Sequence, residues 1–485
     1  MKKIFFTVVI LTTVITTQAQ KELQTFKKIN KEVLKNSQAY ATLKHSGETI
    51  GHRLTGSANG AKAEQYAYDL FTKYGFKDVQ FQPFEVVSWS RESVSFSIRN
   101  NGVEQTYKAV TLAHSPVSVD LQHAEIVDLG NGLEADYLQN PDKAKGKVVF
   151  ASLGLLPNSP AGTKNLHRSE KTALAIKYGA KGIILFNGVK GGILLTGTAS
   201  VTGDLIPIPA VNISNEDGWV IKELLNTRPL QVSIKMKNHS GPIKARNVIA
   251  TLPGKKYPNE KIVIGGHLDS WDLANGAIDN GIGSFSIIDI ARTFKALNLK
   301  TDRTIEFVMF MGEEQGLLGS THYVENAIKS NTLENVVYMV NYDMAGNAIG
   351  FTAGGRKEAD AFFKSVGELV KQVDTAFPNQ SGAGGAGLHS DHEPFMLQGV
   401  PTASSSSRMD RKIYDCYHAD CDATNLIDPS WMVNQVRFAS MFLYALANAK
   451  ELPAKKMSDE ETKQFLINAN LKEALKIAGD WRWND

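Results

Sequence analysis

Acidic and histidine side chains gather where apolar, strand-like runs end in the second half of the chain. They are His267 and Asp269 after KIVIGG, Asp279 in GAIDNG, Glu313 and Glu314 after TIEFVMFMG, Asp343 at the end of VVYMVNYD, and His418 in a later polar loop. Open α/β sheets bind ligands outside the carboxyl ends of their strands. We therefore expect these side chains to lie close together.

These residue types suit a pair of zinc ions. Zinc readily takes imidazole nitrogen and carboxylate oxygen, and two neighbouring ions need one bridging carboxylate plus terminal ligands on each. Two histidines, two aspartates and one glutamate meet that count: His267, Asp279, Glu314, Asp343 and His418. A water shared by such ions is acidified enough to attack near neutral pH, yet a base must still take its second proton. Glu313, adjacent to Glu314, is the expected base.

Each of these residues, taken alone, has a structural explanation. An Asp or Glu at the end of a strand is usually a helix cap or a solvated surface group. The ordered combination is what favours a metal site. Two further acids fit supporting positions: Asp269 would orient the ring of His267, and Asp422 would orient the ring of His418.

Cys416 and Cys421, the only cysteines, flank His418. In an oxidising compartment a short-loop disulfide between them is allowed, and it would fix the loop that carries this histidine. A pair of buried free thiols is the alternative.

The elements that must position these residues follow from the hydrophobic pattern. Residues 244–452 alternate strands and helices, and the strands are near-continuous apolar runs: NVIATL, KIVIGG, TIEFVMF, VVYMVNYDM and VPTASSS. Such runs are typical of buried strands in a doubly wound α/β sheet. A helix is expected at 282–297, and Pro429 begins a final helix that runs to Ala449.

Residues 20–114 are expected to form the amino-terminal part of the same domain. We predict a helix from 21 to about 46 and an amphipathic helix that ends near Gly75. Strands are expected at 79–87 and 93–98.

Between these parts, residues 115–243 have short strands separated by glycine and proline. This pattern of short strands and turns indicates a separate, β-rich inserted domain. Near the end of the chain, Ser458 and Glu461 have the spacing of a capping box, so residues 453–485 are expected to form a helical extension.

The composition excludes some classes of function. The chain has 485 residues, of which 42% are hydrophobic, enough for more than one buried core. Its 53 Lys and Arg nearly balance its 50 Asp and Glu without any basic block, so neither a nucleic-acid groove nor a charged membrane patch is indicated. Residues 1–19 place two lysines before a short apolar run, which predicts a cleaved signal peptide and a periplasmic or secreted protein without a membrane span. The sequence leaves a homodimer open.

The motifs GGHLDSWD, GAIDNG, GEEQG, NYDMAG and YHADCD resemble those of the co-catalytic di-zinc aminopeptidases and carboxypeptidases, most closely the carboxypeptidase Q branch. IGHRLTGSANGAKAEQYAYDLFTKYGF resembles the opening helix of that family, and residues 115–243 resemble its protease-associated domain. SDHEPFMLQGVPTAS resembles a further signature on the substrate side. The resemblance implies a doubly wound mixed sheet of the zinc-peptidase type, with the protease-associated domain inserted.

The resemblance also implies a role for single residues. His267 and Asp343 would bind one zinc ion, Glu314 and His418 the other, Asp279 would bridge the two, and Glu313 would be the base. Tyr417 matches a position at which relatives have a tyrosine that donates to the developing oxyanion. Ser390 and Asp391 fall on the substrate side.

The implied activity is exopeptidase hydrolysis of short peptides, by an aminopeptidase or a dipeptidase. Glu313 would deprotonate the attacking water and pass the proton to the leaving amine. Carboxypeptidase action on peptides ending in glutamate is the alternative, and it would need a basic pocket for two carboxylates. We also consider a catalytically inactive receptor, whose relatives lack metal ligands, and a glutaminyl cyclase, which uses one zinc ion and lacks the inserted domain.

Overall fold

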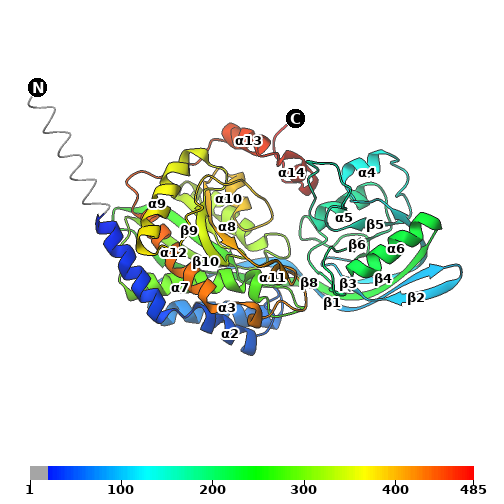
Figure 1. Ribbon diagram of the computed structural model, residues 1–485, viewed down its shortest axis with the longest axis horizontal. Coiled ribbons are helices and arrows are strands. Elements are labelled where there is room, and N and C mark those ends of the chain that lie inside the picture. Colours follow the sequence, from blue (N-terminus) through cyan, green and yellow to red (C-terminus); the bar gives the residue numbers. More distant parts are fainter. Residues whose placement is uncertain (1–19, 485) are drawn as a thin grey trace, which may run out of the picture.

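The computed structural model describes residues 20–484, which form two lobes (Figure 1). The signal peptide expected over residues 1–19 lies outside the described residues. The larger lobe holds the alternating strands and helices of the second half of the chain, and the smaller lobe holds most of the inserted segment. Across residues 20–484 we find no helix both long enough and apolar enough to cross a membrane.

The larger lobe is built on a mixed sheet with the strand order β12-β13-β11-β9-β10-β8. These strands are β8 (Gln231–Leu252), β9 (Tyr257–His267), β10 (Arg303–Phe310), β11 (Val336–Asn341), β12 (Asn347–Thr352) and β13 (Thr402–Arg408). The central strand β9 runs parallel to β10 and β11, and β11 runs parallel to β13. The outer strands β8 and β12 are antiparallel to their neighbours. The predicted α/β sheet is thus confirmed as a mixed sheet.

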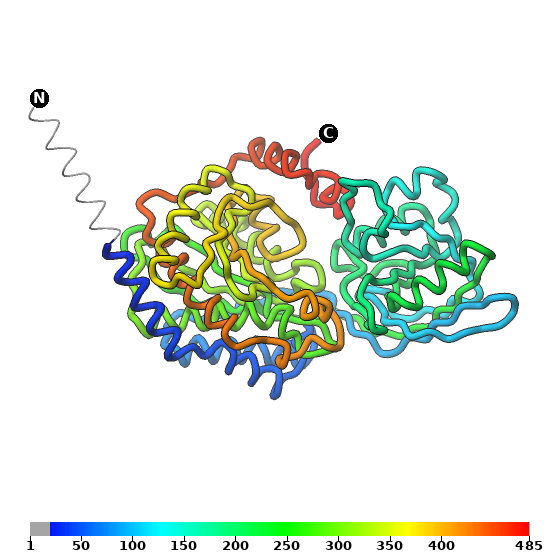
Figure 2. The backbone as a smooth tube through the Cα atoms, in the orientation of Figure 1, coloured from blue at the N-terminus to red at the C-terminus, as the bar shows by residue number. Residues whose placement is uncertain are grey.

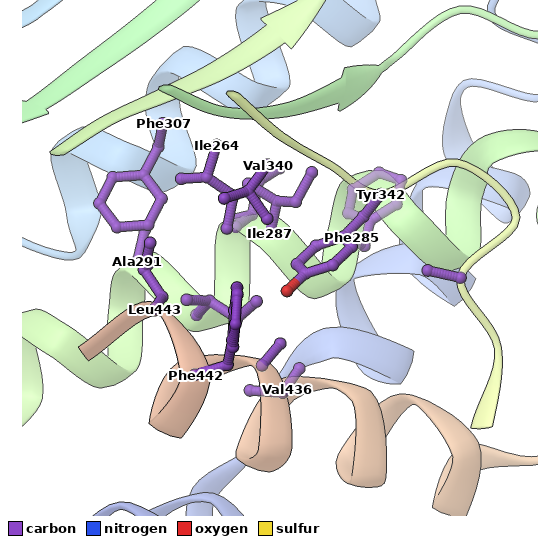
Figure 3. Packing of buried hydrophobic residues seen from close by; sticks show 14 of the residues in the cluster. Ile264, Phe285, Ile287, Ala291, Phe307, Val340, Tyr342, Val436, Phe442 and Leu443 are labelled. Atoms are coloured by element: carbon purple, nitrogen blue, oxygen red, sulfur yellow. The ribbon is translucent and has the colours of Figure 1, made fainter. Parts of the chain in front are cut away.

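Helices cover both faces of this sheet. One face carries a helix over residues 20–36 together with α2 (Ala39–Thr49), α3 (Ala58–Lys73), α7 (Ile282–Ala296), α9 (Asp360–Val373) and α12 (Pro429–Ala447). The other face carries α8 (Leu318–Lys329) and α10 (Glu393–Leu397). Side chains of β9 alternate between the two cores, since Ile262 and Ile264 join the first and Val263 the second. The first core lies between the strands, α7 and α12, as Figure 3 shows for Ile264, Phe307, Val340, Ile287, Ala291, Phe442 and Leu443.

The smaller lobe is also an α/β structure. Its elements are β3 (Ala109–Thr111), β4 (Ser118–Asp128), α4 (Glu134–Leu138), β5 (Val148–Ser152), α5 (Arg168–Lys177), β6 (Gly182–Phe186), β7 (Ala210–Ile213) and α6 (Asn215–Thr227). The strands β4, β5, β6 and β7 are parallel, and β3 is antiparallel to β7. Leu174 of α5 packs in the core on one face of this sheet, and Ile221 of α6 packs in the core on the other.

Two long strands connect the lobes. We expected two short strands before residue 100, but β1 (Val79–Asn100) is a single strand of 22 residues with a bulge between Arg91 and Ser93. It pairs antiparallel with β8, also of 22 residues, and continues into the hairpin strand β2 (Val103–Tyr107). The expected boundary at residue 243 therefore falls inside β8.

Both ends of the described chain differ in detail from the prediction. The first helix is interrupted after residue 36, where Ser37 leaves the helical path and donates its hydroxyl to Asp289 Oδ2 at 2.7 Å. The carboxyl-terminal extension forms two helices, α13 (Asp459–Asn468) and α14 (Lys472–Ala478). Figure 2 shows this segment, in red, lying against both lobes. Leu475 packs beside Met396 of the larger lobe, and Ile477 packs against the core of the smaller lobe.

Candidate active site

The predicted site residues lie at one edge of the larger sheet. His267 is the last residue of β9, Glu313 and Glu314 follow β10, and Asp343 follows β11. Because these three strands are parallel, their carboxyl ends meet at the same edge. Asp279 lies nearby in the short π-helical turn η1 (Ala277–Gly281) at the start of α7.

The five predicted ligands form two groups that share Asp279. One group is His267, Asp279 and Asp343, and the other is Asp279, Glu314 and His418, with the ligand atoms of each group within 4.8 Å of one another. Nε2 of His267 lies 3.1 Å from Asp279 Oδ1, whereas Nε2 of His418 lies 2.8 Å from Asp279 Oδ2. The two oxygens of Asp279 thus face different histidines, which is the arrangement that a bridging carboxylate requires.

The donors of both groups suit a divalent cation. Glu314 Oε2 lies 3.0 Å from Nε2 of His418, while its Oε1 is buried and has no hydrogen-bond partner within residues 20–484. Burial, reinforced by the charge of Asp279, raises the pKa of Glu314 well above its ordinary value. A buried, unpartnered carboxylate oxygen among imidazoles and other carboxylates is costly without a cation, so these residues fit a zinc ion.

Glu313 belongs to neither group and lies beside both. Its side chain is 11% exposed, and Oε2 lies 4.0 Å from Nε2 of His267. Burial is the main cause that raises the pKa of Glu313 well above its ordinary value, and the charge of Asp343 acts in the same direction. The backbone N–H of Glu313 donates to Asp269 Oδ1 at 3.3 Å. The backbone of Glu313 is therefore held by Asp269, while its carboxyl lies near His267 without belonging to either ligand group.

Asp269 supports His267 through its backbone. The ring atom Nδ1 of His267 lies 3.1 Å from the carbonyl oxygen of Asp269, but 3.7 Å from its carboxylate. The carboxylate is turned toward the N–H of Glu313. Asp269 thus contacts a candidate ligand and the candidate base at once.

Asp422 does not contact His418 in the way the sequence suggested. Its two carboxylate oxygens accept from the backbone N–H groups of Ile278 and Asp279, at 2.6 and 3.2 Å. Asp422 therefore fixes the η1 turn that carries the shared carboxylate, because the buried N–H groups of this turn need an acceptor.

The smaller lobe, rather than Asp422, contacts the ring of His418. Nδ1 of His418 lies 3.2 Å from the carbonyl oxygen of Thr196 and 2.7 Å from Nη2 of Arg168. Burial and then the charge of Arg168 lower the pKa of His418, which keeps the ring neutral, the form that binds metals.

Arg168 is a functional candidate that the sequence did not indicate. It is the first residue of α5 and only 7% exposed, and its Nε has no hydrogen-bond partner in the described part of the chain. An arginine at the start of a helix is usually a surface residue, and its neighbour His418 lies 250 positions away. No local signal in the sequence marks this contact.

The loop around His418 is tied down at several points. Cys416 and Cys421 form a disulfide with a Cα–Cα distance of 5.2 Å. The carbonyl oxygen of His418 accepts from the N–H of Thr196 at 2.9 Å. The ring of Tyr417 stacks on that of His418 with centroids 3.8 Å apart, and burial raises the pKa of Tyr417 well above its ordinary value.

Ser390 and Asp391 lie behind the ligands. Ser390 donates its hydroxyl to Asp343 Oδ2 at 2.6 Å and accepts from the amide of Asn341 at 2.7 Å. Asp391 is fully buried, and burial raises its pKa to about 7. Ser390 therefore positions a candidate ligand, whereas we expected it on the substrate side.

A cavity of about 780 Å³ opens beside the ligand groups and is lined by both lobes. Among the side chains that line it are Arg168, Glu170, Glu313, Leu317, Glu393 and Tyr417. Its volume falls within the range of cavities that hold small ligands. Its walls carry both polar and apolar side chains. It is large enough for a short peptide.

The chain is similar in sequence to known proteins. Residues 247–443 match Peptidase family M28, and residues 119–221 match the PA domain. The chain is 26% identical to carboxypeptidase Q of Xenopus laevis over 89% of this chain and 92% of that protein. It is 28% identical to a probable leucine aminopeptidase 2 of Aspergillus oryzae over 70% of this chain and 65% of that protein.

A solved structure has the same two-lobe fold. The crystal structure of a peptidase M28 precursor from Shewanella amazonensis superposes with a TM-score of 0.75 at 25% identity. The match covers 91% of this chain and 100% of that one. The similarity therefore extends over both lobes.

Proposed function

We propose that this chain, which matches peptidase family M28 over residues 247–443 and the PA domain over residues 119–221, is a zinc-dependent exopeptidase of short peptides. The observation that carries the proposal is the pair of ligand groups that share Asp279, with Glu313 beside both. Two zinc ions are the proposed occupants, one held by His267, Asp279 and Asp343 and the other by Asp279, Glu314 and His418. Bound there, they would acidify a water molecule and polarise the scissile carbonyl.

Glu313 is the proposed general base. Its carboxylate accepts a proton from the attacking water and then returns it to the leaving amine. A carboxyl whose pKa is raised by burial suits both steps, because it holds the proton more firmly than an ordinary glutamate and still releases it. Tyr417, which lines the cavity, is the proposed donor to the oxyanion that forms on the carbonyl.

Arg168 supports substrates with a free carboxyl terminus. Arg168 lines the same cavity as Glu313 and Glu314, and a guanidinium is a strong hydrogen-bond donor to a carboxylate. One such group fits a peptide with one carboxylate better than a peptide that ends in glutamate. We therefore propose dipeptides and other short peptides as substrates, and place glutamate carboxypeptidase activity second.

Aminopeptidase action remains the main alternative, because one of the relatives is a probable leucine aminopeptidase. A receptor without activity is disfavoured, since all five candidate ligands are present. A glutaminyl cyclase with a single zinc ion is disfavoured by the presence of two ligand groups. We also propose that the protein is exported to the periplasm or secreted, which is consistent with its disulfide.

A peptide panel with metal analysis tests this proposal. We expect about two zinc ions per chain, loss of activity with a chelator, and recovery when zinc is restored. Dipeptides with free ends should be cleaved, whereas amidation of the carboxyl terminus should lower kcat/KM. If amidated peptides are cleaved equally well and blocking of the amino terminus abolishes cleavage, the protein is an aminopeptidase instead. No hydrolysis of any peptide by the zinc-loaded protein would refute the proposal.

A further inference from the structure

Two buried carboxyl groups face the same cavity at a distance from the metal ligands. Glu170 lies in the first turn of α5 in the smaller lobe and is 2% exposed. Glu393 begins α10 in the larger lobe and is 4% exposed. Both line the cavity that Glu313 and Glu314 also line. Each lobe thus contributes one buried acid to the lining of the same cavity.

The hydrogen bonds of these acids leave their charges uncompensated. Glu170 Oε2 accepts from the N–H of His167 at 2.6 Å, in a capping box, but Glu170 Oε1 is buried and has no hydrogen-bond partner among residues 20–484. Glu393 Oε2 accepts from the N–H of His389 at 2.6 Å. Nε2 of His389 lies 3.6 Å from Glu170 Oε1, beyond hydrogen-bond distance.

The cationic side chains nearby are engaged elsewhere. Arg168 contacts His418, and Lys171 donates its ammonium to the carbonyl oxygens of Ser152 and Leu153. Arg482, on the carboxyl-terminal segment, binds the carboxylate of Asp459 and the carbonyl oxygen of Leu397. Among the described residues, neither Glu170 nor Glu393 forms an ion pair with a lysine or arginine.

The other titratable neighbours do not supply a positive charge. Burial lowers the pKa of His389 to about 4 and holds that of His167 well below its ordinary value, so both rings are neutral near pH 7. Asp480, at the edge of the cavity, adds a further acid. Burial raises the pKa of Glu170 to about 7, against the opposing charge of Lys171, and that of Glu393 to about 8, helped by Asp480 and Glu170.

We propose that Glu170 and Glu393 form a subsite for a cationic group of the substrate peptide, foremost the side chain of lysine or arginine. The inference rests on the proposed exopeptidase function and adds the substrate class. An ammonium or guanidinium between the two carboxylates would give each a charge-assisted hydrogen bond, including the unpartnered Oε1 of Glu170. A free amino terminus offers the same chemistry, and the test separates the two sources.

The test compares lysine with norleucine, which has the same chain length without the charge. Dipeptides carry one or the other at either position, and each is assayed with wild-type protein and with the double variant Glu170→Gln/Glu393→Gln. Glutamine keeps the acceptors that cap α5 and receive the N–H of His389, so the fold should be retained. We expect the lysine peptide to lose roughly 10- to 100-fold in kcat/KM, as for a lost charge-assisted hydrogen bond, while the norleucine peptide is unchanged.

Glu325→Gln is the matched control. Glu325 also lines the cavity, but it is exposed and already paired with Lys329 at 3.1 Å, so its loss should leave the ratio of lysine to norleucine unchanged. In wild-type protein this ratio should rise between pH 6 and pH 9 as the two acids ionise, since the side-chain ammonium of lysine stays charged over that range. In the double variant the ratio should be flat with pH.

The outcomes separate the subsite from the activity. Suppose that norleucine peptides are cleaved and that the double variant leaves the ratio of kcat/KM for lysine to norleucine peptides unaltered at both positions. The proposed cation subsite is then refuted, whereas the proposed exopeptidase activity is not. If the variant instead removes only the preference for free over acetylated amino termini, the amino terminus is the occupant. If no peptide is cleaved, calorimetry with free lysine and free norleucine still tests the subsite. Lysine must bind the wild type more tightly than norleucine does, and the double variant must lose this preference.

Discussion

Nη2 of Arg168 lies 2.7 Å from Nδ1 of His418, although the two residues come from different lobes. The inserted lobe therefore takes part in the candidate site. It supplies a guanidinium beside one candidate ligand and, through Thr196, two backbone contacts to the same residue. Activity should depend on how the lobes are docked as well as on the ligands themselves.

Replacement of Glu313 by glutamine should abolish turnover and leave the fold intact. Glutamine has the same shape but cannot accept the proton of the attacking water, and general-base catalysis contributes roughly 100- to 10,000-fold in rate. Zinc content and the melting temperature should match those of the wild type, while kcat falls. Near-normal activity in the Glu313→Gln protein would remove this residue from the mechanism.

Replacement of Arg168 by methionine should raise KM for peptides with a free carboxylate by roughly tenfold or more, because a charge-assisted hydrogen bond is lost. Peptide amides should be affected much less. Arg168→Lys keeps the charge but not the planar fork of donors, so it should recover only part of the affinity. Equal losses for acids and amides would mean that Arg168 supports only the ring of His418.

Gly197→Ala gives an independent check on Arg168. Gly197 has a φ of +138°, and a Cβ added there would lie 1.8 Å from Nε of Arg168. The methyl group must displace the guanidinium, so this variant should show the same selective rise in KM while Arg168 itself is kept. Gly188→Ala, on the same loop with open space around it, is the control and should behave as wild type.

Replacement of both Cys416 and Cys421 by serine should loosen the loop that carries His418. A cross-link that closes so short a loop is worth about 2 kcal/mol by the chain-entropy relation. We expect zinc to dissociate at lower chelator concentration in the variant, while the thermal unfolding of the smaller lobe, read by limited proteolysis, is unaltered. Unchanged zinc retention would show that the contacts with Thr196 alone hold the loop.

His114 should contribute to the loss of stability in acid. The ring is fully buried, its Nδ1 lies 2.9 Å from Thr198 Oγ1, and burial lowers its pKa to about 4. The unfolded chain binds a proton near pH 6.5 and the folded chain only near pH 4, so the free energy of unfolding falls as the pH drops through that window. His114→Asn, which tolerates the φ of +66° at this position, should reduce that fall by up to about 3 kcal/mol. Parallel pH profiles of wild type and variant would contradict this role.

The candidate ligands could be predicted because each follows a strand whose apolar pattern is readable. The strand ends after His267 and before Glu313 are local features, and the parallel pairing of β9, β10 and β11 brings them together. Local sequence was a poor guide to the partner of Asp422, and the predicted contact with the ring of His418 was wrong. Its neighbours in sequence suggested His418, whereas the folded loop turns its carboxylate toward the η1 turn.

Contacts between the lobes could not be predicted. Arg168 and Glu170 have no local pattern that marks them, and although Glu393 lies in the motif SDHEPFMLQGVPTAS, its meeting with Glu170 depends on how an inserted lobe docks against another fold. The interrupted first helix has the same kind of cause, since the contact of Ser37 with Asp289 spans 252 positions. The single strand β1 was also missed, because its bulge at Arg91 and Ser93 reads as a break between two strands.

The paired strands β1 and β8 determine how the two walls of the cavity can move. They run as one antiparallel ladder from the larger lobe into the smaller, and the carboxyl-terminal helices contact both lobes on a separate path. A single flexible segment would leave the lobes free to reorient, whereas two hydrogen-bonded strands restrict their relative motion to bending of the ribbon. Because Glu170 lies in one lobe and Glu393 in the other, the spacing of the two acids depends on the bend of this ribbon.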